Sequence, residues 1–225
     1  MQTRKQTSNQ DLASPLHIAM VTETFQPEVN GVVTTLGHSV KGMCLLRHIV
    51  HLIRLRQHGQ DVALQREGYT ETLMANMLTS ECFDESAIEP FDKRFLKMWQ
   101  KQRPDIVHIS TAGPLGWSAM SAACGLSLPV VADFHIRFHR HDYAASWHNK
   151  RIAAYLRFFY NRANCTIVPT TELQMQLMQL GFKKVEVVTS GVNQLEKLLL
   201  NIVNSQGDRH VETKFSSERR TAKIE

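Results

Sequence analysis

Residues 16–40 read LHIAMVTETFQPEVNGVVTTLGHSV, and this stretch determines the fold that we expect for the chain. Its short apolar run, residues 18–21, is typical of a buried parallel strand. A polar turn that contains a proline follows, and beyond Gly31 apolar residues recur at the spacing of an amphipathic helix. Asn30 is a favourable N-cap residue, because its side-chain oxygen can accept a free amide of the first turn. A strand, a tight turn and an uncovered helix amino terminus together predict an anion-binding site.

The same stretch also has a purely structural interpretation. The first strand–turn–helix unit of any Rossmann-like domain contains a capping residue and a glycine, so the residues alone do not separate structure from phosphate binding. The turn lacks the G-x-G-x-x-G sequence of dinucleotide-binding proteins, which argues against a nicotinamide or flavin site. We therefore expect no cofactor.

Length and composition favour one sizeable core in a cytoplasmic protein. The chain has 225 residues, of which 43% are hydrophobic. Its four cysteines are isolated from one another, which is typical of reduced thiols in the cytosol. Residues 1–14 are polar and lack the apolar core of a secretion signal, and we expect them to be a disordered leader. No apolar run is long enough to span a membrane.

The formal net charge of +5 permits attraction to anionic lipid or to nucleic acid. An ordinary basic surface explains the charge equally well. No helix-turn-helix, zinc-finger or RNP pattern supports a nucleic-acid binder, so we expect no nucleic-acid partner and retain peripheral contact with the inner membrane face as an expectation.

Strand and helix patterns alternate along the rest of the chain, which predicts a doubly wound α/β fold with a mostly parallel sheet and helices on both faces. Residues 44–47 offer no glycine for the left-handed cap that should end the first helix, whereas Gly181 offers one at the end of a later helix. In the helix predicted over residues 149–163 we expect an inward face of Ile152, Tyr155, Leu156 and Phe159. The other predicted strands are 48–55, 72–77, 106–109, 128–134, 165–168 and 185–188, and the other predicted helices are 91–102, 117–124 and 173–180.

Three stretches resemble the N-terminal domain of family 4 retaining glycosyltransferases: ETFQPEVNGV at 23–32, RPDIVHISTAGPLGWSA at 103–119 and FHIRFHRHD at 134–142. The resemblance extends from about Leu16 to Asn193. It implies half of a GT-B fold, in which two Rossmann-like domains face each other across a cleft. Ile136 stands where the family usually has threonine, so a hydroxyl contact there would be lost.

The resemblance also implies roles for individual residues. Around the first turn, the family lines its cleft near the acceptor and the donor diphosphate with the residues that match Glu23, Asn30, Gly31 and Val32. Thr111 and Gly113 belong to a second matching turn, which we place at the carboxyl edge of the sheet where open α/β sheets bind ligands.

The third matching stretch supplies the residue to which we assign a catalytic role, His135, which would contact the transferred sugar through a ring nitrogen. A histidine that only caps a strand end is the structural alternative. Arg137 could meet a phosphate or remain solvated in its loop, and Glu172 could orient the acceptor. A zinc site formed by His135, His139 and His141 is disfavoured, because this sequence is not the H-E-x-x-H of zinc proteases, and we expect no metal.

The last part of the chain does not continue into a second Rossmann-like domain. We expect residues 15–192 to form the first domain, residues 193–204 to form an amphipathic helix packed on it, and residues 205–225 to be a disordered tail. The resemblance implies retaining transfer of a hexosyl group, such as mannosyl, from a nucleotide-diphosphate sugar to a lipid or glycan acceptor. Because the donor domain is not recognisable, we expect the chain to be inactive alone. The alternative is a non-catalytic binding or oligomerisation module derived from the same domain.

Overall fold

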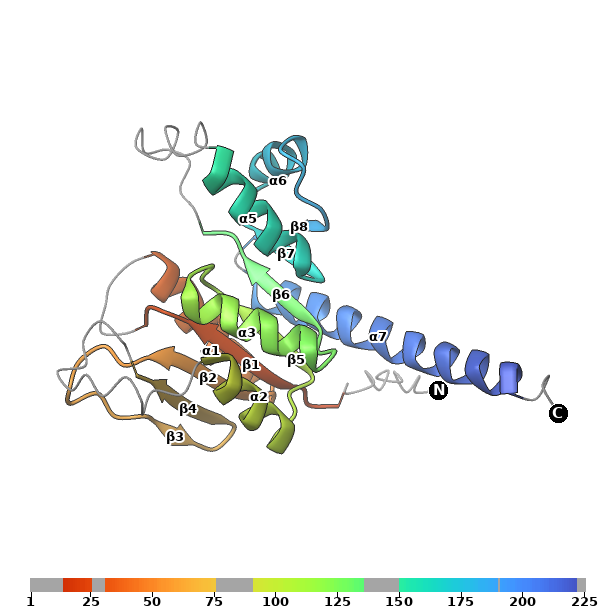
Figure 1. The fold of residues 1–225 in the computed structure, drawn as a ribbon. Helices are drawn as coiled ribbons and strands as arrows, with labels where there is room; N and C mark the ends of the chain where they lie inside the picture. Colours follow the sequence, from red (N-terminus) through yellow and green to blue (C-terminus); the bar gives the residue numbers. More distant parts are fainter. Residues whose placement is uncertain (1–13, 26–30, 76–90, 136–149, 190, 222–225) are drawn as a thin grey trace, which may run out of the picture.

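A computed structural model describes residues 14–25, 31–75, 91–135, 150–189 and 191–221, with side chains described as far as residue 206. The chain builds one eight-stranded sheet with the strand order β3-β4-β2-β1-β5-β6-β7-β8 (Figure 1). Every pair of neighbouring described strands is parallel except β3–β4, which is antiparallel. The predicted fold class, a doubly wound and mostly parallel α/β sheet, is therefore confirmed.

The central strands are buried on both faces, as expected for apolar runs in a parallel sheet. Within β1 and β5, for example, almost every side chain is buried. The strands are β1 (His17–Thr22), β2 (Ile49–Leu55), β3 (Gln65–Arg66), β4 (Tyr69–Met74), β5 (Ile106–Ile109), β6 (Val130–Asp133), β7 (Cys165–Val168) and β8 (Val185–Val187).

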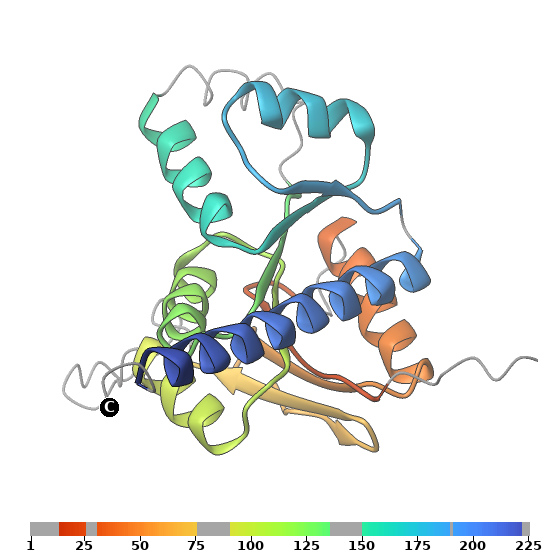
Figure 2. The same ribbon diagram turned by 90° about the vertical axis from the view of Figure 1, so that its right-hand side faces the viewer.

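Helices cover both faces of the sheet, in two groups that correspond to two clusters of buried side chains. On one face lie α2 (Phe91–Lys101), α3 (Pro114–Gly125), α5 (Lys150–Arg162) and α6 (Thr171–Gln179). On the other face α1 (Gly31–Leu45) lies beside α7 (Val192–Thr221), which crosses the sheet diagonally (Figure 2). No helix within the described residues is both long and apolar enough to cross a membrane.

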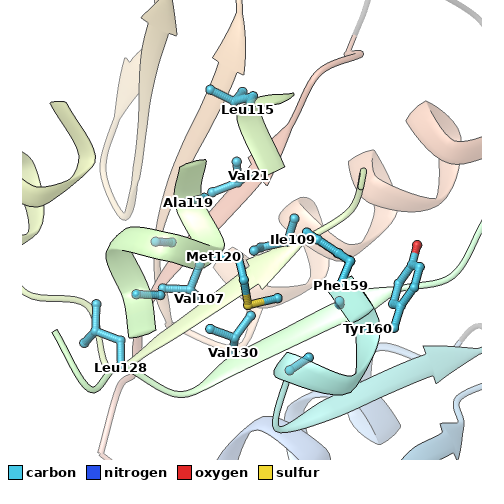
Figure 3. Close-up of a cluster of buried hydrophobic side chains, with 14 of the residues drawn as sticks. Val21, Val107, Ile109, Leu115, Ala119, Met120, Leu128, Val130, Phe159 and Tyr160 are labelled. Atoms are coloured by element: carbon cyan, nitrogen blue, oxygen red, sulfur yellow. The ribbon is translucent and has the colours of Figure 1, made fainter. Parts of the chain in front are cut away.

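The larger cluster fixes α3 and α5 on the central strands. Figure 3 shows side chains of β1, β5 and β6 meeting those of the two helices. The small alanines of α3 allow the helix to lie close to the sheet, and the bulky Phe159 and Tyr160 of α5 also belong to the cluster. The labelled members are Val21, Val107, Ile109, Leu115, Ala119, Met120, Leu128, Val130, Phe159 and Tyr160.

The first turns of α7 complete the smaller cluster. Leu195 and Leu199 are buried there. A Cβ atom on Gly42 of α1 would lie 2.4 Å from a methyl group of Val192, so the glycine provides the space in which α7 begins. Helix α7 continues to Thr221, well beyond the end near residue 204 that the sequence predicts.

His48 joins this helix to the first two strands. The amide of Leu16 donates to His48 Nδ1 (3.0 Å), and His48 Nε2 lies 3.0 Å from Glu196 Oε1 in α7. Because Nδ1 accepts a hydrogen bond, Nε2 must carry the proton that is shared with the carboxylate.

Three helices end in the same Schellman arrangement, although only one of them has a glycine at the left-handed position. At the end of α1 the amide of His48 donates to the carbonyl of Met43 and the amide of Arg47 to that of Cys44. Arg47 has φ 66°, and Ser127 after α3 has φ 53°, whereas Gly181 after α6 has φ 84° as the sequence predicts. The missing glycine after α1 therefore did not alter the turn, and Arg47 occupies the left-handed conformation instead.

Arg47→Gly is expected to raise the free energy of unfolding by about 0.5–1 kcal/mol. The left-handed conformation is strained for a residue with a Cβ atom, and relief of this strain exceeds the extra chain entropy that glycine loses on folding. Urea denaturation followed by circular dichroism measures the change. Lys41→Gly, at an exposed position within α1, is the matched control and should lower stability by about 1 kcal/mol. A loss of stability in both variants would contradict the argument.

Two sequence predictions are corrected by the structure. The strand predicted over 72–77 begins earlier, at Tyr69, and pairs with the short strand β3 in a hairpin that the charge-rich sequence concealed. Helix α5 is rotated relative to the prediction: Ile152 and Tyr155 are 41% and 44% exposed, while the side chain of Tyr160 is buried. Aromatic residues occur on several sides of this helix, so their spacing did not specify its orientation.

Candidate functional site

The candidate site lies where the order of the strands reverses. From β1 the chain proceeds outward to β2 on one side, and β5 later pairs with the other side of β1. The helices that follow β1 and β5, α1 and α3, consequently lie on opposite faces of the sheet. The loops between them separate at the carboxyl edge, which is the position where open α/β sheets bind ligands.

Glu23, the residue after β1, connects the two loops. Its amide donates to Thr111 Oγ1 (3.1 Å), and its Oε1 accepts a hydrogen bond from the amide of Leu115 in the first turn of α3 (2.9 Å). Burial raises the pKa of Glu23, and the hydrogen bond from Leu115 partly opposes this shift. The carboxylate thus caps α3, whose own N-cap residue, Gly113, has no side chain to do so.

Gly113 is required at this turn because the carboxylate of Glu23 occupies the adjacent space. A Cβ atom on Gly113 would lie 2.0 Å from Glu23 Oε2. The structure therefore brings together three of the residues predicted to bind substrate, namely Glu23, Thr111 and Gly113. It also shows that Glu23 Oε1 is already occupied by a helix amide.

At the next strand end, a buried carboxylate lies between two imidazoles. Asp133 Oδ1 lies 2.8 Å from His108 Nε2, and Oδ2 lies 3.3 Å from Nε2 of His135 and accepts a hydrogen bond from the Ser110 hydroxyl (3.2 Å). Burial opposes ionisation of Asp133, but the two imidazoles outweigh it and lower its pKa. The hydroxyl of Tyr160 donates to the Asp133 carbonyl (3.0 Å) and anchors the strand end. A quarter of the His135 side chain remains exposed.

Residues of α5 and α3 form the edge of the site. The hydroxyl of Tyr155 donates to the carbonyl of Ala112 (2.9 Å), beside Gly113. Its ring lies 5.5 Å from that of Trp117, centroid to centroid. Burial raises the pKa of Tyr155, a contact with Trp117 lowers it and the charge of Glu23 raises it further. Sequence reasoning missed this residue, because it assigned Tyr155 to the core.

A second charged network, also missed, supports the Glu23 loop from β2. Gln57 donates through Nε2 to the carbonyl of Glu23 (3.0 Å), and the guanidinium of Arg54 lies 5.9 Å from the ring centre of Phe25. Arg54 in turn pairs with Asp61 (2.6 Å) and with Glu71 (3.1 Å). The signal in the sequence was the arginine itself, because a charged residue within a buried apolar strand requires partners.

The other predicted site residues are more dispersed. Gly31 is exposed as the first residue of α1 and Val32 is half-buried, while Asn30 and Arg137 lie outside the described residues. Glu172 is exposed in the first turn of α6, two strands from β5. Its neighbour Thr170 is the N-cap of α6 and accepts from the amide of Leu173 (3.2 Å).

The zinc alternative involved residues that the structure describes only in part. His139 and His141 lie outside the described residues. Within the described part of the chain, no group of three histidine, cysteine or carboxylate side chains is arranged to hold a metal ion.

Comparison with known proteins gives one family. The model of Glycosyltransferase Family 4 matches residues 29–194. A GDP-mannose-dependent alpha-mannosyltransferase of Mycolicibacterium smegmatis is 24% identical over 91% of this chain, and one of Mycobacterium tuberculosis is 25% identical over 79%. This chain spans 54% and 48% of their respective lengths, about half of each. A sulfoquinovosyl transferase of Arabidopsis thaliana is 31% identical over 35% of the chain, which covers 16% of that protein.

Solved structures resemble the fold. A sucrose-phosphate synthase from Thermosynechococcus elongatus superposes with a TM-score of 0.58 at 12% identity, over 76% of this chain and 47% of that one. A UDP-GlcNAc 2-epimerase from Methanocaldococcus jannaschii gives 0.53 at 15% identity, over 89% of this chain and 52% of that one. The resemblance to the synthase supports the predicted half of a GT-B fold.

Proposed function

Because this chain belongs to glycosyltransferase family 4, we propose that it is the acceptor-side domain of a retaining hexosyltransferase that uses a nucleotide-diphosphate sugar. The two GDP-mannose-dependent relatives favour mannosyl transfer. The proposed acceptor is a lipid or a glycan, met in the cytoplasm and, for a lipid, at the inner membrane face. The chain alone would be inactive, since it spans about half the length of these relatives.

One observation carries the proposal: residues from three strand ends are linked at the strand reversal. Glu23 contacts Thr111 after β5, the neighbouring Ser110 contacts Asp133 at the end of β6, and Asp133 contacts His135. Polar groups of these loops would thus face a single ligand placed over this edge of the sheet.

The charges at this edge suggest how a donor would be oriented. Glu23 already neutralises the amino terminus of α3. Its carboxylate would repel a phosphate there, whereas it could accept a hydrogen bond from a sugar hydroxyl. The amino terminus of α1, which begins at the exposed Gly31 and has no acidic residue in its first turn, suits the diphosphate better. We assign Asn30 to the same role on the resemblance alone, and Arg137 because its guanidinium could meet a phosphate.

Sugar transfer with retention breaks the bond from the anomeric carbon to the diphosphate and forms a bond to an acceptor oxygen on the same face of the ring. Stabilising the leaving diphosphate and orienting the hexose are the main contributions expected of the protein. In this proposal His135 holds the hexose through a ring nitrogen, while Glu172 orients the acceptor from the first turn of α6.

Binding of sugar nucleotides to the isolated chain tests the proposal. In ¹H–¹⁵N spectra, GDP-mannose should shift the amide signals of Glu23, Thr111 and His135, with a weak dissociation constant of about 1 mM, because the chain spans only about half the length of its GDP-mannose-dependent relatives. Titration with UDP-glucose tests whether a different base and sugar bind equally well. GDP alone, which has no sugar, should leave the amide signal of His135 unchanged. His135→Ala should abolish the difference between GDP-mannose and GDP, whereas the exposed His58→Ala should retain it. Shifts confined to other parts of the chain would contradict the proposal.

Exposed apolar side chains favour a second candidate, a non-catalytic module that pairs with another chain. Phe158, Met175 and Met178 on α5 and α6 are 59%, 55% and 59% exposed. Light scattering at several protein concentrations measures whether the chain self-associates and so distinguishes the non-catalytic module from the transferase domain. Self-association that Phe158→Ser abolishes would favour the module, and a monomer at all concentrations would eliminate self-pairing.

A further inference from the structure

The carboxylate of Asp133 and the imidazole of His135 form a pair in which the position of one proton can be deduced. Nε2 of His135 is screened from solvent and lies 3.3 Å from Asp133 Oδ2, a close electrostatic contact that does not have the geometry of a hydrogen bond. A bare nitrogen lone pair in that position would face the negative oxygen and be repelled. In the neutral imidazole, Nε2 must therefore carry the hydrogen and Nδ1 the lone pair.

We propose that Asp133 is a positioning residue that fixes His135 as the Nε2–H tautomer and thereby presents Nδ1 as a hydrogen-bond acceptor to a ligand hydroxyl. The identity of that ligand, the hexose of a sugar nucleotide, rests on the proposed function. The proton position rests only on the geometry of the two side chains.

The surroundings of Asp133 explain why a carboxylate is needed there. His108 is almost fully buried, and its Nε2 makes the shorter contact, 2.8 Å to Oδ1. The Ser110 hydroxyl donates to Oδ2, which His135 also faces. Two imidazole nitrogens and a hydroxyl thus lie close to the two oxygens, and an ionised carboxylate favours a proton-bearing nitrogen at each end.

The substitution Asp133→Asn provides a test because it preserves the shape and converts one acceptor into a donor. We expect the amide oxygen to remain with His108, which has the shorter contact and is the more deeply buried. The amide nitrogen would then point its hydrogens at Nε2 of His135. That nitrogen must become an acceptor, and the proton moves to Nδ1.

Long-range ¹H–¹⁵N spectra of the imidazoles measure the tautomer directly, because protonated and bare ring nitrogens have well-separated shifts. At a pH of about 8.5, where a free imidazole is neutral, the native chain should show His135 as Nε2–H. Asp133→Asn should show it as Nδ1–H. The control Ser110→Ala removes the other partner of Oδ2 and should leave the tautomer unchanged, and the spectrum of His135→Gln assigns the signals.

Two results would overturn the proposal: an Nδ1–H tautomer in the native chain, or an unchanged tautomer in a folded Asp133→Asn. If that variant does not fold, the tautomer of His135 in the native spectrum still tests the proposal. The result is also independent of ligand binding. If sugar nucleotides fail to bind and the tautomer changes as expected, the proposed function fails while the positioning role of Asp133 stands.

Discussion

Arg54→Met is expected to lower the free energy of unfolding by about 3–5 kcal/mol, because it leaves the buried Glu71 and the partly buried Asp61 without their cation. Arg54 is 4% exposed, and its guanidinium donates to both oxygens of Asp61, at 2.6 and 2.8 Å, and to Glu71 at 3.1 Å. Glu71 also accepts hydrogen bonds from the Tyr69 hydroxyl and from the amide of Leu64. With the arginine removed, the buried Glu71 and the partly buried Asp61 face each other without a cation between them.

The pH dependence of the stability difference shows whether the loss comes from the ion pair between Arg54 and Asp61. Arg54 lowers the pKa of Asp61 from 3.8 to about 2, chiefly through the hydrogen bond between them and against the effect of burial. A group with a lowered pKa stabilises the native state above its unfolded pKa and loses that contribution as the pH falls through the folded value. In the native chain this loss falls between about pH 4 and pH 2. The difference between the native chain and Arg54→Met should therefore be largest near neutral pH and shrink below pH 4.

Urea denaturation and thermal melting measure the loss, which corresponds to about 6–20 °C in melting temperature for a domain of this size. Arg56→Met, an exposed neighbour two residues away, is the control and should change stability by no more than about 0.5 kcal/mol. Similar losses in both variants, or a loss that does not vary with pH, would contradict the role assigned to Arg54.

Gly116→Ala is expected to lower the free energy of unfolding by about 3 kcal/mol or more, because the added methyl group would overlap backbone. The new Cβ atom would lie 2.0 Å from the carbonyl oxygen of Thr111 and 3.1 Å from a methyl group of Ile109. Neither neighbour is the end of a flexible side chain, so relief requires α3 to move away from the loop after β5. Because Thr111 also accepts the amide hydrogen of Glu23, this movement would separate the two loops of the candidate site.

The same helix offers the control. At Gly125, the last and exposed residue of α3, the nearest atom to an added Cβ is Leu96 Cδ2 at 3.9 Å. Gly125→Ala should therefore be neutral or raise stability by up to about 1 kcal/mol, because alanine loses less conformational entropy in a helix. Amide spectra of Gly116→Ala should show the largest changes at Glu23 and Thr111. Equal stability of the two alanine variants would refute the steric argument.

The sequence was informative about the fold wherever one chemical property dominated a segment. The apolar runs of β1, β5 and β7 identified buried strands, and Gly181 correctly marked the end of a helix. It was misleading where several residues competed for one role. The aromatic residues of α5 could have faced the core in more than one way, and Arg47 showed that a left-handed turn can form without glycine.

The candidate site was predictable in its parts and not in its contacts. Glu23, Thr111 and Gly113 were identified from two separate stretches, yet only the structure shows that the carboxylate caps α3 and thereby explains the glycine. The pairing of Asp133 with His108 and His135 joins two strands, and nothing in the sequence relates positions 25 residues apart on neighbouring strands. Tyr155 was missed because its spacing assigned it to the core, and the partners of Arg54 could not be identified from the sequence although an arginine within an apolar strand requires them.

The position of α7 affects how the domain would form during synthesis. Chains emerge from the ribosome beginning at the amino terminus, and every strand of this sheet precedes α7 in the sequence. Until residues 192–203 have emerged, the apolar surface that later contacts Leu195 and Leu199 lacks its cover, and His48 lacks Glu196. A nascent chain paused before this helix would therefore expose an apolar surface that is prone to aggregation, and a chaperone could bind there until translation resumes.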